Sequence, residues 1–185
     1  WVNSTTLEFD LREGVKFHNG EQFDADDVVF TLNYLAVPEN GAKPQRNVNW
    51  WKNAEKLGDY KVRLNLKTEF PAALEFLSGP IVMYPNEYYG DVGPEGMALK
   101  PIGTGPYQVT SVEPGKRYKF KKYDDYHPAS PKGAASIGNI VMRTIAESNT
   151  QLAELFSGGI DWIWKVKPDQ AERINSQGRF TVKNS

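Results

Sequence analysis

One segment near the start of the chain, Val15–Leu35, constrains the fold more than any other because it joins a strand end, a tight turn and a helix start. Just before it, residues 6–11 alternate apolar and polar side chains, which predicts a strand with one buried face. Asn19-Gly20 is a strong turn dipeptide because both residues tolerate a positive φ. Asp24 can cap the helix that follows. The buried stripe of this helix is predicted to comprise Val28, Val29, Leu32 and Leu35.

Three aspartates gather at the predicted helix start: Asp24, Asp26 and Asp27. A cluster of this kind can serve as paired acids for hydrolysis or for cation binding. Helix capping explains all three without further assumptions, because carboxylates accept hydrogen bonds from the free N–H groups of a first turn and favour the positive end of the helix dipole. We therefore predict a structural role for them.

The composition argues against several classes of partner. The 185 residues include 22 Lys and Arg against 23 Asp and Glu, so the net charge gives no reason to expect a nucleic acid or an acidic membrane. Hydrophobic residues make up 39% and charged residues 24%, as in an ordinary globular domain. No apolar run is long enough to span a bilayer. Cysteine is absent, which suits a cell-envelope protein but also many cytosolic ones.

Two further elements are predicted in the first half of the chain. Residues 61–66 alternate cleanly and form a second strand, the candidate neighbour for residues 6–11. Residues 70–77 form a short helix with proline in its first turn. The aromatic-rich residues 48–57 are expected to be partly extended. Residues 81–101, rich in proline and glycine, predict a surface loop with short helical pieces.

The second half alternates strand and helix patterns. A hairpin is predicted from residues 107–112 and 117–123, with further strands at 140–145, 160–164 and 180–183 and helices at 148–156 and 168–174. Such alternation is typical of an α/β sheet with crossover connections.

No group of residues supports catalysis or metal binding. His18 and His127 are the only histidines, and a zinc site needs three or four closely spaced ligands. We predict both to be exposed structural residues, since neither belongs to a nucleophile motif. Gly103-Thr104-Gly105 lacks the Gly-Lys-Ser/Thr of a phosphate loop and leads into a strand, so it predicts a tight backbone passage.

A basic run with interleaved aromatics occupies residues 116–122. It could be a nucleic-acid stripe. Period-two alternation offers a simpler interpretation, in which Tyr118 and Phe120 face the core while Lys119 and Lys121 face water. We favour the second interpretation because the net charge is close to zero.

The tryptophans are the remaining candidates for binding. Trp162 and Trp164 lie one strand period apart, so they share a face and Ile163 lies on the other. That face could be a buried core surface or an exposed one. Trp164 stands at the predicted strand end, where pockets in α/β sheets open. Trp50-Trp51 follow Arg46 and Asn49 in a loop.

Three separated blocks, in order, resemble one protein family. They are residues 15–35 (VKFHNGEQFDADDVVFTLNYL), residues 101–126 (PIGTGPYQVTSVEPGKRYKFKKYDDY) and residues 148–164 (SNTQLAELFSGGIDWIW). Together they are similar to the extracellular solute-binding proteins of family 5, which serve bacterial ABC importers of oligopeptides, dipeptides and nickel complexes. One departure is local, because the family usually has Trp where His127 stands.

The resemblance implies a fold class and a division of the chain. It implies an α/β fold with mixed sheets that forms part of one lobe of a type II periplasmic-binding-protein clamshell. Residues 1–99 would form a smaller α+β subdomain and residues 100–185 the start of the main α/β lobe. The predicted first strand has no segment before it, and the family's proteins are much longer than this chain. We therefore expect the chain to be an internal fragment.

The resemblance also implies a site, partners and a location. The positions that match the family's cleft residues are Trp164, Arg46, Asn49, Trp50 and Ser78. The ligand would be a peptide, a sugar or a metal chelate, delivered to an ABC permease in the membrane, with no cofactor, catalytic residue or nucleic acid involved. The protein would lie in the periplasm or cell envelope.

Two rival functions stay open at this point. One is a secreted carbohydrate-directed hydrolase that uses acids such as Asp161 with a distant glutamate, which a carboxylate pair across a cleft would favour. The other is a non-enzymatic interaction module whose contact surface is the basic hairpin around Lys119 and Lys121.

Overall fold

The structure is a computed structural model that describes residues 1–183. The chain divides into two compact units, one spanning Trp1–Met142 and the other starting at Arg143. Each has its own hydrophobic core. The predicted subdomain boundary between residues 99 and 100 stays a prediction.

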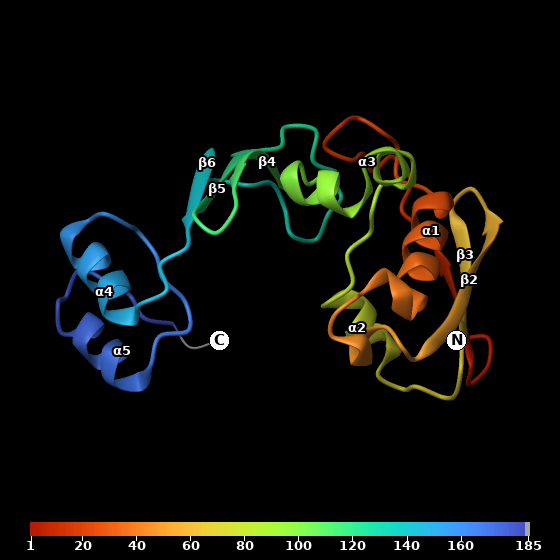
Figure 1. Cartoon of the computed structure of the whole chain (residues 1–185), viewed down its shortest axis with the longest axis horizontal. Coiled ribbons are helices and arrows are strands. Elements are labelled where there is room, and N and C mark those ends of the chain that lie inside the picture. Colours follow the sequence, from red (N-terminus) through yellow and green to blue (C-terminus); the bar gives the residue numbers. More distant parts are fainter. Residues whose placement is uncertain (184–185) are drawn as a thin grey trace. The chain divides into compact units, whose positions relative to one another are not determined.

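The first unit contains a three-stranded antiparallel sheet with a helix on one face (Figure 1). Its elements are β1 (Thr6–Asp10), α1 (Ala25–Ala36), β2 (Trp51–Gly58) and β3 (Lys61–Leu66). The strand order is β1-β3-β2, so the predicted neighbour of the first strand is confirmed. In register, Leu7 lies opposite Leu64 and Phe9 opposite Val62. Leu7, Leu64 and Val62 are almost fully buried, as the alternation predicts.

The start of α1 confirms the predicted capping for Asp24 and Asp27 but not for Asp26. The Asp24 carboxylate accepts from the backbone N–H of Asp26 at 2.8 Å, and the Asp27 carboxylate accepts from the backbone N–H of Asp24 at 2.9 Å. This reciprocal arrangement satisfies two N–H groups at the helix start. Asp26 instead forms an ion pair with Lys56 at 2.8 Å. The predicted buried stripe is also confirmed, with Val28 and Leu32 buried and Val29 and Leu35 packed against the same core.

Short helices make up much of the first unit outside its first sheet, up to residue 99. They are the 3₁₀ turns η1 (Pro38–Asn40) and η2 (Gln45–Asn47) and the helices α2 (Ala73–Ser78) and α3 (Asn86–Leu99). The α3 segment consists of two helices joined at a kink, where Gly93 has a φ of 64° and a ψ of −174° before Pro94. A residue with a side chain rarely adopts this conformation, so glycine is required here. The predicted short helical pieces are confirmed, but they occupy Asn86–Leu99, so the prediction that residues 81–101 are mainly a loop was wrong.

A second three-stranded sheet follows in the order β4-β5-β6. Its strands are β4 (Tyr107–Glu113), β5 (Arg117–Lys122) and β6 (Asn139–Arg143). Along β5, Tyr118 and Phe120 are half-buried while Lys119 and Lys121 are exposed. The basic run is therefore the solvent face of a strand, as the alternation predicts.

His18 connects the start of the chain to the segment before β4. Its Nε2 lies 2.9 Å from the carbonyl oxygen of Gly105, and the backbone N–H of Gly103 donates to its Nδ1 at 3.3 Å. The predicted tight passage at Gly103–Gly105 is thus held by an imidazole that is half-buried, and the prediction that His18 is exposed was wrong. In the sequence His18 lies beside a turn, which predicts an exposed side chain. In the structure its ring contacts Gly103 and Gly105, which lie more than 80 positions further along the chain.

We expect His18 to make folding stability depend on pH. Burial lowers the pKa of its imidazole below the reference value of 6.5, and the bond to Gly105 offsets this in part. The folded state therefore takes up a proton less readily than the unfolded state, so the contribution of His18 is fully present above pH 6.5 and is lost as the pH falls below it. Thermal unfolding between about pH 7 and about pH 5 should show a steeper loss of Tm for the wild type than for His18→Gln. Parallel curves for the two proteins would contradict this expectation.

The second unit is built from two helices, α4 (Ser148–Ser157) and α5 (Pro168–Asn175), which confirms both predicted helices. Its core contains Leu152, Leu155 and Ile174. The strands predicted at residues 160–164 and 180–183 were wrong, because both segments are irregular. A strand needs a hydrogen-bonded neighbour, and within residues 1–183 no strand pairs with either segment.

No helix within the described part of the chain combines the length and the apolar character needed to cross a membrane.

Candidate functional site

Two exposed tryptophans form the most conspicuous surface feature of the second unit. Trp162 is 70% exposed and Trp164 is 59% exposed, although tryptophan is usually largely buried. Their ring centroids lie 5.0 Å apart and their planes meet at 87°, so the two rings pack edge to face. Ile163, between them, packs against the core of the unit. The predicted alternation is therefore confirmed even though no strand carries it.

The backbone after this pair is unusual. Lys165 has a φ of 56°, and among the described residues it is the one non-glycine residue with a positive φ. This conformation is costly for a residue with a side chain and marks a sharp change of direction. Lys165 lies between the exposed Trp164 and Val166, which packs against the core. Lys167 then occupies the N-cap position of α5.

The first unit holds the other four predicted site residues. Trp50 is only 7% exposed, and its ring stacks on Phe70 at 4.7 Å. Its Nε1–H donates to the backbone carbonyl of Asn47 at 2.8 Å. The structure thus gives Trp50 a packing role that leaves little of its ring for a ligand, and its assignment as a ligand contact stays a prediction.

Arg46, Asn49 and Ser78 are exposed. Arg46 lies in η2, and Ser78 ends α2 with its hydroxyl donating to the carbonyl of Glu75 at 3.1 Å. Trp50 lies beside this turn, and its ring meets Phe76 of α2 edge-on at 6.4 Å. The contacts of Trp50 with Phe70 and Phe76 therefore pack the loop that carries Arg46 and Asn49 against α2. Trp164 belongs to the second unit, so its sharing of a cleft with these residues stays a prediction.

The two histidines and Asp161, the candidates named from the sequence, have the following surroundings in the described part of the chain. Both histidines bond to backbone carbonyls, His18 to Gly105 and His127 to Glu13, so neither is aligned with a nucleophile. Asp161, the candidate acid of the hydrolase alternative, is exposed. Within residues 1–183 no three His, Cys, Asp or Glu side chains come close enough together to hold a metal ion.

Carboxylates of the second unit have structural partners. The pKa of Glu147 is lowered because the backbone N–H of Thr150 donates to it at 2.8 Å, which caps α4. The pKa of Glu154 is lowered by the Arg143 guanidinium, 2.9 Å away. These groups hold α4 in place beside the tryptophan segment.

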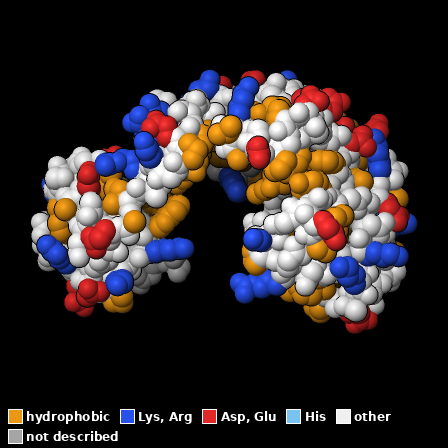
Figure 2. Space-filling view, viewed as in Figure 1, with side chains coloured by type: hydrophobic (Ala, Val, Ile, Leu, Met, Phe, Trp, Pro, Cys, Tyr) orange, Lys and Arg blue, Asp and Glu red, His pale blue; other side chains and the backbone are white. Residues whose placement is uncertain are grey.

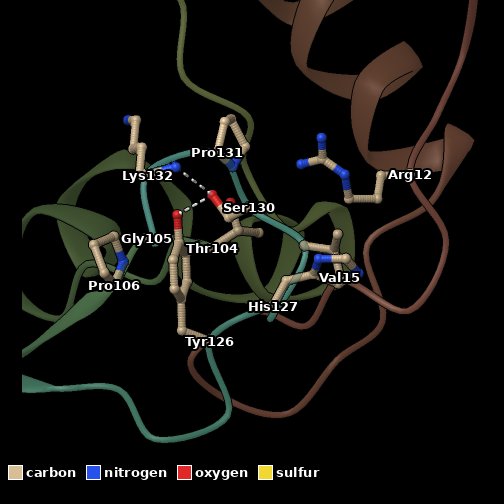
Figure 3. Close-up of a pocket in the computed structure, with 10 residues that line it drawn as sticks. All are labelled: Arg12, Val15, Thr104, Gly105, Pro106, Tyr126, His127, Ser130, Pro131 and Lys132. Atoms are coloured by element: carbon tan, nitrogen blue, oxygen red, sulfur yellow. Dashed lines mark hydrogen bonds between the residues drawn. The ribbon is translucent and has the colours of Figure 1, made fainter. Parts of the chain in front are cut away.

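The first unit contains two pockets that the sequence reasoning missed. The larger, of about 560 Å³, is lined by apolar and aromatic side chains that include Tyr84, Tyr89, Met97 and Tyr107. Figure 2 shows hydrophobic side chains gathered on the surface of this unit around α3, which contributes to the pocket. The smaller, of about 270 Å³, is lined by both polar and apolar residues and includes His127 (Figure 3). His127 is half-buried, so the prediction that it is exposed was wrong.

Comparison with known proteins places the chain in a family. The model of the family described as bacterial extracellular solute-binding proteins, family 5 Middle, matches residues 2–185. The glutathione-binding protein GsiB of Pectobacterium atrosepticum is 28% identical over 178 residues, which cover 96% of this chain and 34% of that protein.

Solved structures share the fold. NikZ from Campylobacter jejuni, in complex with Ni(L-His), matches with a TM-score of 0.76 and 27% identity over 85% of this chain and 31% of NikZ. AppA from Bacillus subtilis, in complex with a nonapeptide, matches with a TM-score of 0.72 and 27% identity over 85% of this chain and 32% of AppA. The chain thus spans about a third of the length of these relatives.

These matches confirm that the chain is part of a type II periplasmic-binding-protein lobe that combines helices and sheets. The pairs β1–β3, β2–β3 and β4–β5 are antiparallel, whereas mixed sheets were predicted. The order of the three sequence blocks and the capped helix α1 agree with the family match, which spans residues 2–185 of this chain. The chain belongs to the bacterial extracellular solute-binding proteins of family 5.

Proposed function

We propose that this chain is part of the substrate-binding component of a bacterial ABC importer, which captures a peptide or a similar small solute and delivers it to a membrane permease. The observation that carries the proposal is the family match over residues 2–185. Relatives are described as binding glutathione, a nonapeptide or Ni(L-His), and each of these ligands contains an amino acid. We therefore place a peptide first, ahead of a metal chelate or a sugar.

In this proposal the chain supplies part of the wall of a ligand cleft and no catalytic group. Trp164 provides an aromatic platform, Arg46, Asn49 and Ser78 provide polar contacts, and the exposed part of Trp50 provides a second, smaller aromatic contact. Residues 1–99 would form a smaller subdomain and residues 100–185 the start of the main lobe. The protein would act outside the cytoplasm, in the periplasm or cell envelope, where closure of two lobes traps the solute.

The energetics of such a site are reasonable. A ligand that covers a tryptophan face of ~200 Å² gains at most ~5 kcal/mol at the usual hydrophobic coefficient. Ordering and association take back several kcal/mol of this. One or two such platforms, together with backbone hydrogen bonds, suffice to hold a short peptide. The hydrolase and interaction-module alternatives gain no support from the family match.

The most direct test is mass spectrometry of small molecules that co-purify with the complete gene product. A peptide or another small solute released on denaturation is expected. Recovery of the protein in a form that cleaves a glycoside, with no retained solute, would instead favour the hydrolase.

Once a ligand is identified, Trp164→Ala is expected to weaken its binding by roughly 10- to 100-fold, the effect typical of a central aromatic contact. Isothermal titration calorimetry of the complete gene product measures this. The matched control is Trp1→Ala, since Trp1 is similarly exposed, at 55%, and lies outside the predicted site. Equal affinities for wild type and Trp164→Ala would remove Trp164 from the site without affecting the family assignment.

A further inference from the structure

Trp162 and Trp164 form one continuous aromatic surface on the second unit. Their ring centroids lie 5.0 Å apart with the planes at 87°, so the two rings are in direct contact. Trp162 is 70% exposed and Trp164 is 59% exposed, so the pair offers more accessible surface than one fully exposed tryptophan. Both rings of this unit are therefore open to a ligand.

The core of the second unit does not use this pair. Leu152, Leu155 and Ile174 form that core, and Ile163 and Val166 pack against it. The unit thus covers its branched apolar side chains and leaves its two largest apolar side chains in water, although burial of apolar surface is the dominant favourable contribution to folding. A contiguous apolar patch that stays exposed in this way marks a binding surface.

The backbone anchors the pair. Ile163 lies between the two tryptophans and Val166 follows them, and both pack against the core, so the segment is held on its inner side. Lys165 has a φ of 56°, in the left-handed region that residues with a side chain rarely adopt. Conformations of this kind are costly and gather at ligand sites. Because the rings are carried by an anchored backbone, little conformational freedom is lost when a ligand binds.

Two ring faces at right angles favour one kind of ligand group. A third aromatic ring that stacks on the face of one tryptophan meets the other tryptophan edge to face, and both of these arrangements are favourable. A large apolar side chain gains from the same two faces through burial of its surface. A small or polar side chain gains little from either ring.

The charges beside the pair disfavour a cation. A ligand ammonium or guanidinium group can also lie on the face of a tryptophan. Residues 161–167, however, contain one acidic residue, Asp161, and two basic ones, Lys165 and Lys167, and all three are exposed. Their net positive charge opposes a cationic ligand group. A neutral aromatic or apolar group is therefore the better fit.

We propose that Trp162 and Trp164 together form the subsite that receives an aromatic or large apolar side chain of a peptide ligand. The inference deepens the proposed function and rests on it, because it takes the ligand to be a peptide. Of this pair the family resemblance indicated only Trp164. Trp162 joins the site through its ring contact with Trp164 and its exposure. Trp162 is thus a specificity-determining residue, since it contributes the second of two perpendicular ring faces.

The test is isothermal titration calorimetry of the complete gene product with probe tripeptides. Phe-Ala-Ala, Ala-Phe-Ala and Ala-Ala-Phe place one aromatic ring at each position in turn, and Ala-Ala-Ala is the reference. At least one of the three is expected to bind about tenfold or more tightly than Ala-Ala-Ala, the effect of burying one large apolar side chain. The peptide with lysine at that same position should bind no more tightly than Ala-Ala-Ala.

Variants of the protein test the second ring face. Trp162→Ala is expected to reduce the preference for the phenylalanine peptide over Ala-Ala-Ala to about threefold or less, because one of the two aromatic contacts is lost. Trp162→Phe should keep most of the preference, since a smaller ring still supplies a face. Trp1→Ala removes a similarly exposed tryptophan, at 55%, outside the subsite and should leave the preference unchanged. A preference separates a ligand contact from a structural role, because a general distortion weakens the binding of both peptides equally.

Failure of this inference differs from failure of the proposed function. If wild type and Trp162→Ala bind peptides with the same preference, the subsite is wrong and the importer proposal stands. A lysine peptide that binds more tightly than the phenylalanine peptide would overturn the subsite in favour of a cation site. A large fall in Tm for Trp162→Ala with an unchanged preference would show that other parts of the complete protein cover Trp162. If no probe peptide binds, the subsite is refuted, and the mass spectrometry of co-purified solutes still decides the importer proposal.

Discussion

Trp51→Ala is expected to cause the largest loss of folding stability of any single substitution in the first unit, on the order of 3–5 kcal/mol. Trp51 is fully buried between α1 and the sheet. Its Nε1–H donates to the backbone carbonyl of Leu32 at 2.9 Å, and its ring meets Trp50 edge-on at 4.8 Å. Alanine leaves a cavity at the contact between helix and strand, and the surrounding backbone cannot collapse to fill it.

Equilibrium urea unfolding followed by circular dichroism measures this effect. Since domains are typically stable by only about 5–15 kcal/mol, Trp51→Ala should reduce the folded population visibly at 37 °C. Trp1→Ala serves as the control, because its side chain is 55% exposed, and should change stability by no more than about 0.5 kcal/mol. Similar midpoints for the two variants would show that Trp51 does not anchor the core.

Asp27→Ala is expected to have the second largest effect, a loss of about 2–4 kcal/mol, because it leaves two N–H groups without an acceptor. One carboxylate oxygen accepts from the backbone N–H of Asp24, and the other accepts from the backbone N–H of Asn86 at 2.9 Å. The side chain is only 2% exposed. It therefore both caps α1 and fixes the start of α3, which lies 59 residues further along the chain.

The burial of Asp27 has a cost that a neutral replacement tests. Burial raises the pKa of its carboxyl group, while the two backbone N–H bonds act in the opposite direction. Asp27→Asn keeps the shape and one oxygen acceptor, so its loss should be smaller than that of Asp27→Ala.

A graded series of variants completes the test. Asp24→Ala removes one capping bond and should cost about 1 kcal/mol. Asp26→Asn removes only an exposed ion pair with Lys56 and should cost less than about 1 kcal/mol. Chemical denaturation of the four variants under identical conditions gives the order. A loss for Asp26→Asn equal to that for Asp27→Ala would contradict the bridging role of Asp27.

Local sequence patterns predicted most elements of the first unit for a physical reason. The alternation in residues 61–66 and the acidic cap at Asp24 act through neighbours that are close in sequence, and both are confirmed. The second role of Asp27, its bond to Asn86, could not be predicted in this way. It depends on where the chain returns after a long connection.

The second unit shows the opposite case. Its helices carry their own start and stop signals, such as Pro168 and Gly158, so their bounds could be predicted. The strands predicted around Trp162 and Phe180 could not be judged from sequence, because a strand exists only with a partner. The outward direction of both tryptophans follows from the inward packing of Ile163 and needs no strand.

The surroundings of the candidate site residues could likewise not be predicted from local sequence. The resemblance indicated Trp164, and the structure shows it exposed. The resemblance also indicated Trp50, whose ring is covered by Phe70 and Trp51. The sequence shows that a residue is aromatic but not whether its ring is buried in a core or exposed on a binding surface. Only the surroundings of the ring in the structure distinguish the two cases.

The sequence by itself determined the family, the capped helix and the strand alternation, because each depends on residue types at short spacing. The tertiary structure decided which tryptophans are exposed, why His18 is held at Gly103–Gly105, and that Arg12, Ser130 and His127 line one pocket. These facts depend on contacts between residues about 80 to 120 positions apart. Long-range contacts form only when the chain has packed, so no local pattern encodes them.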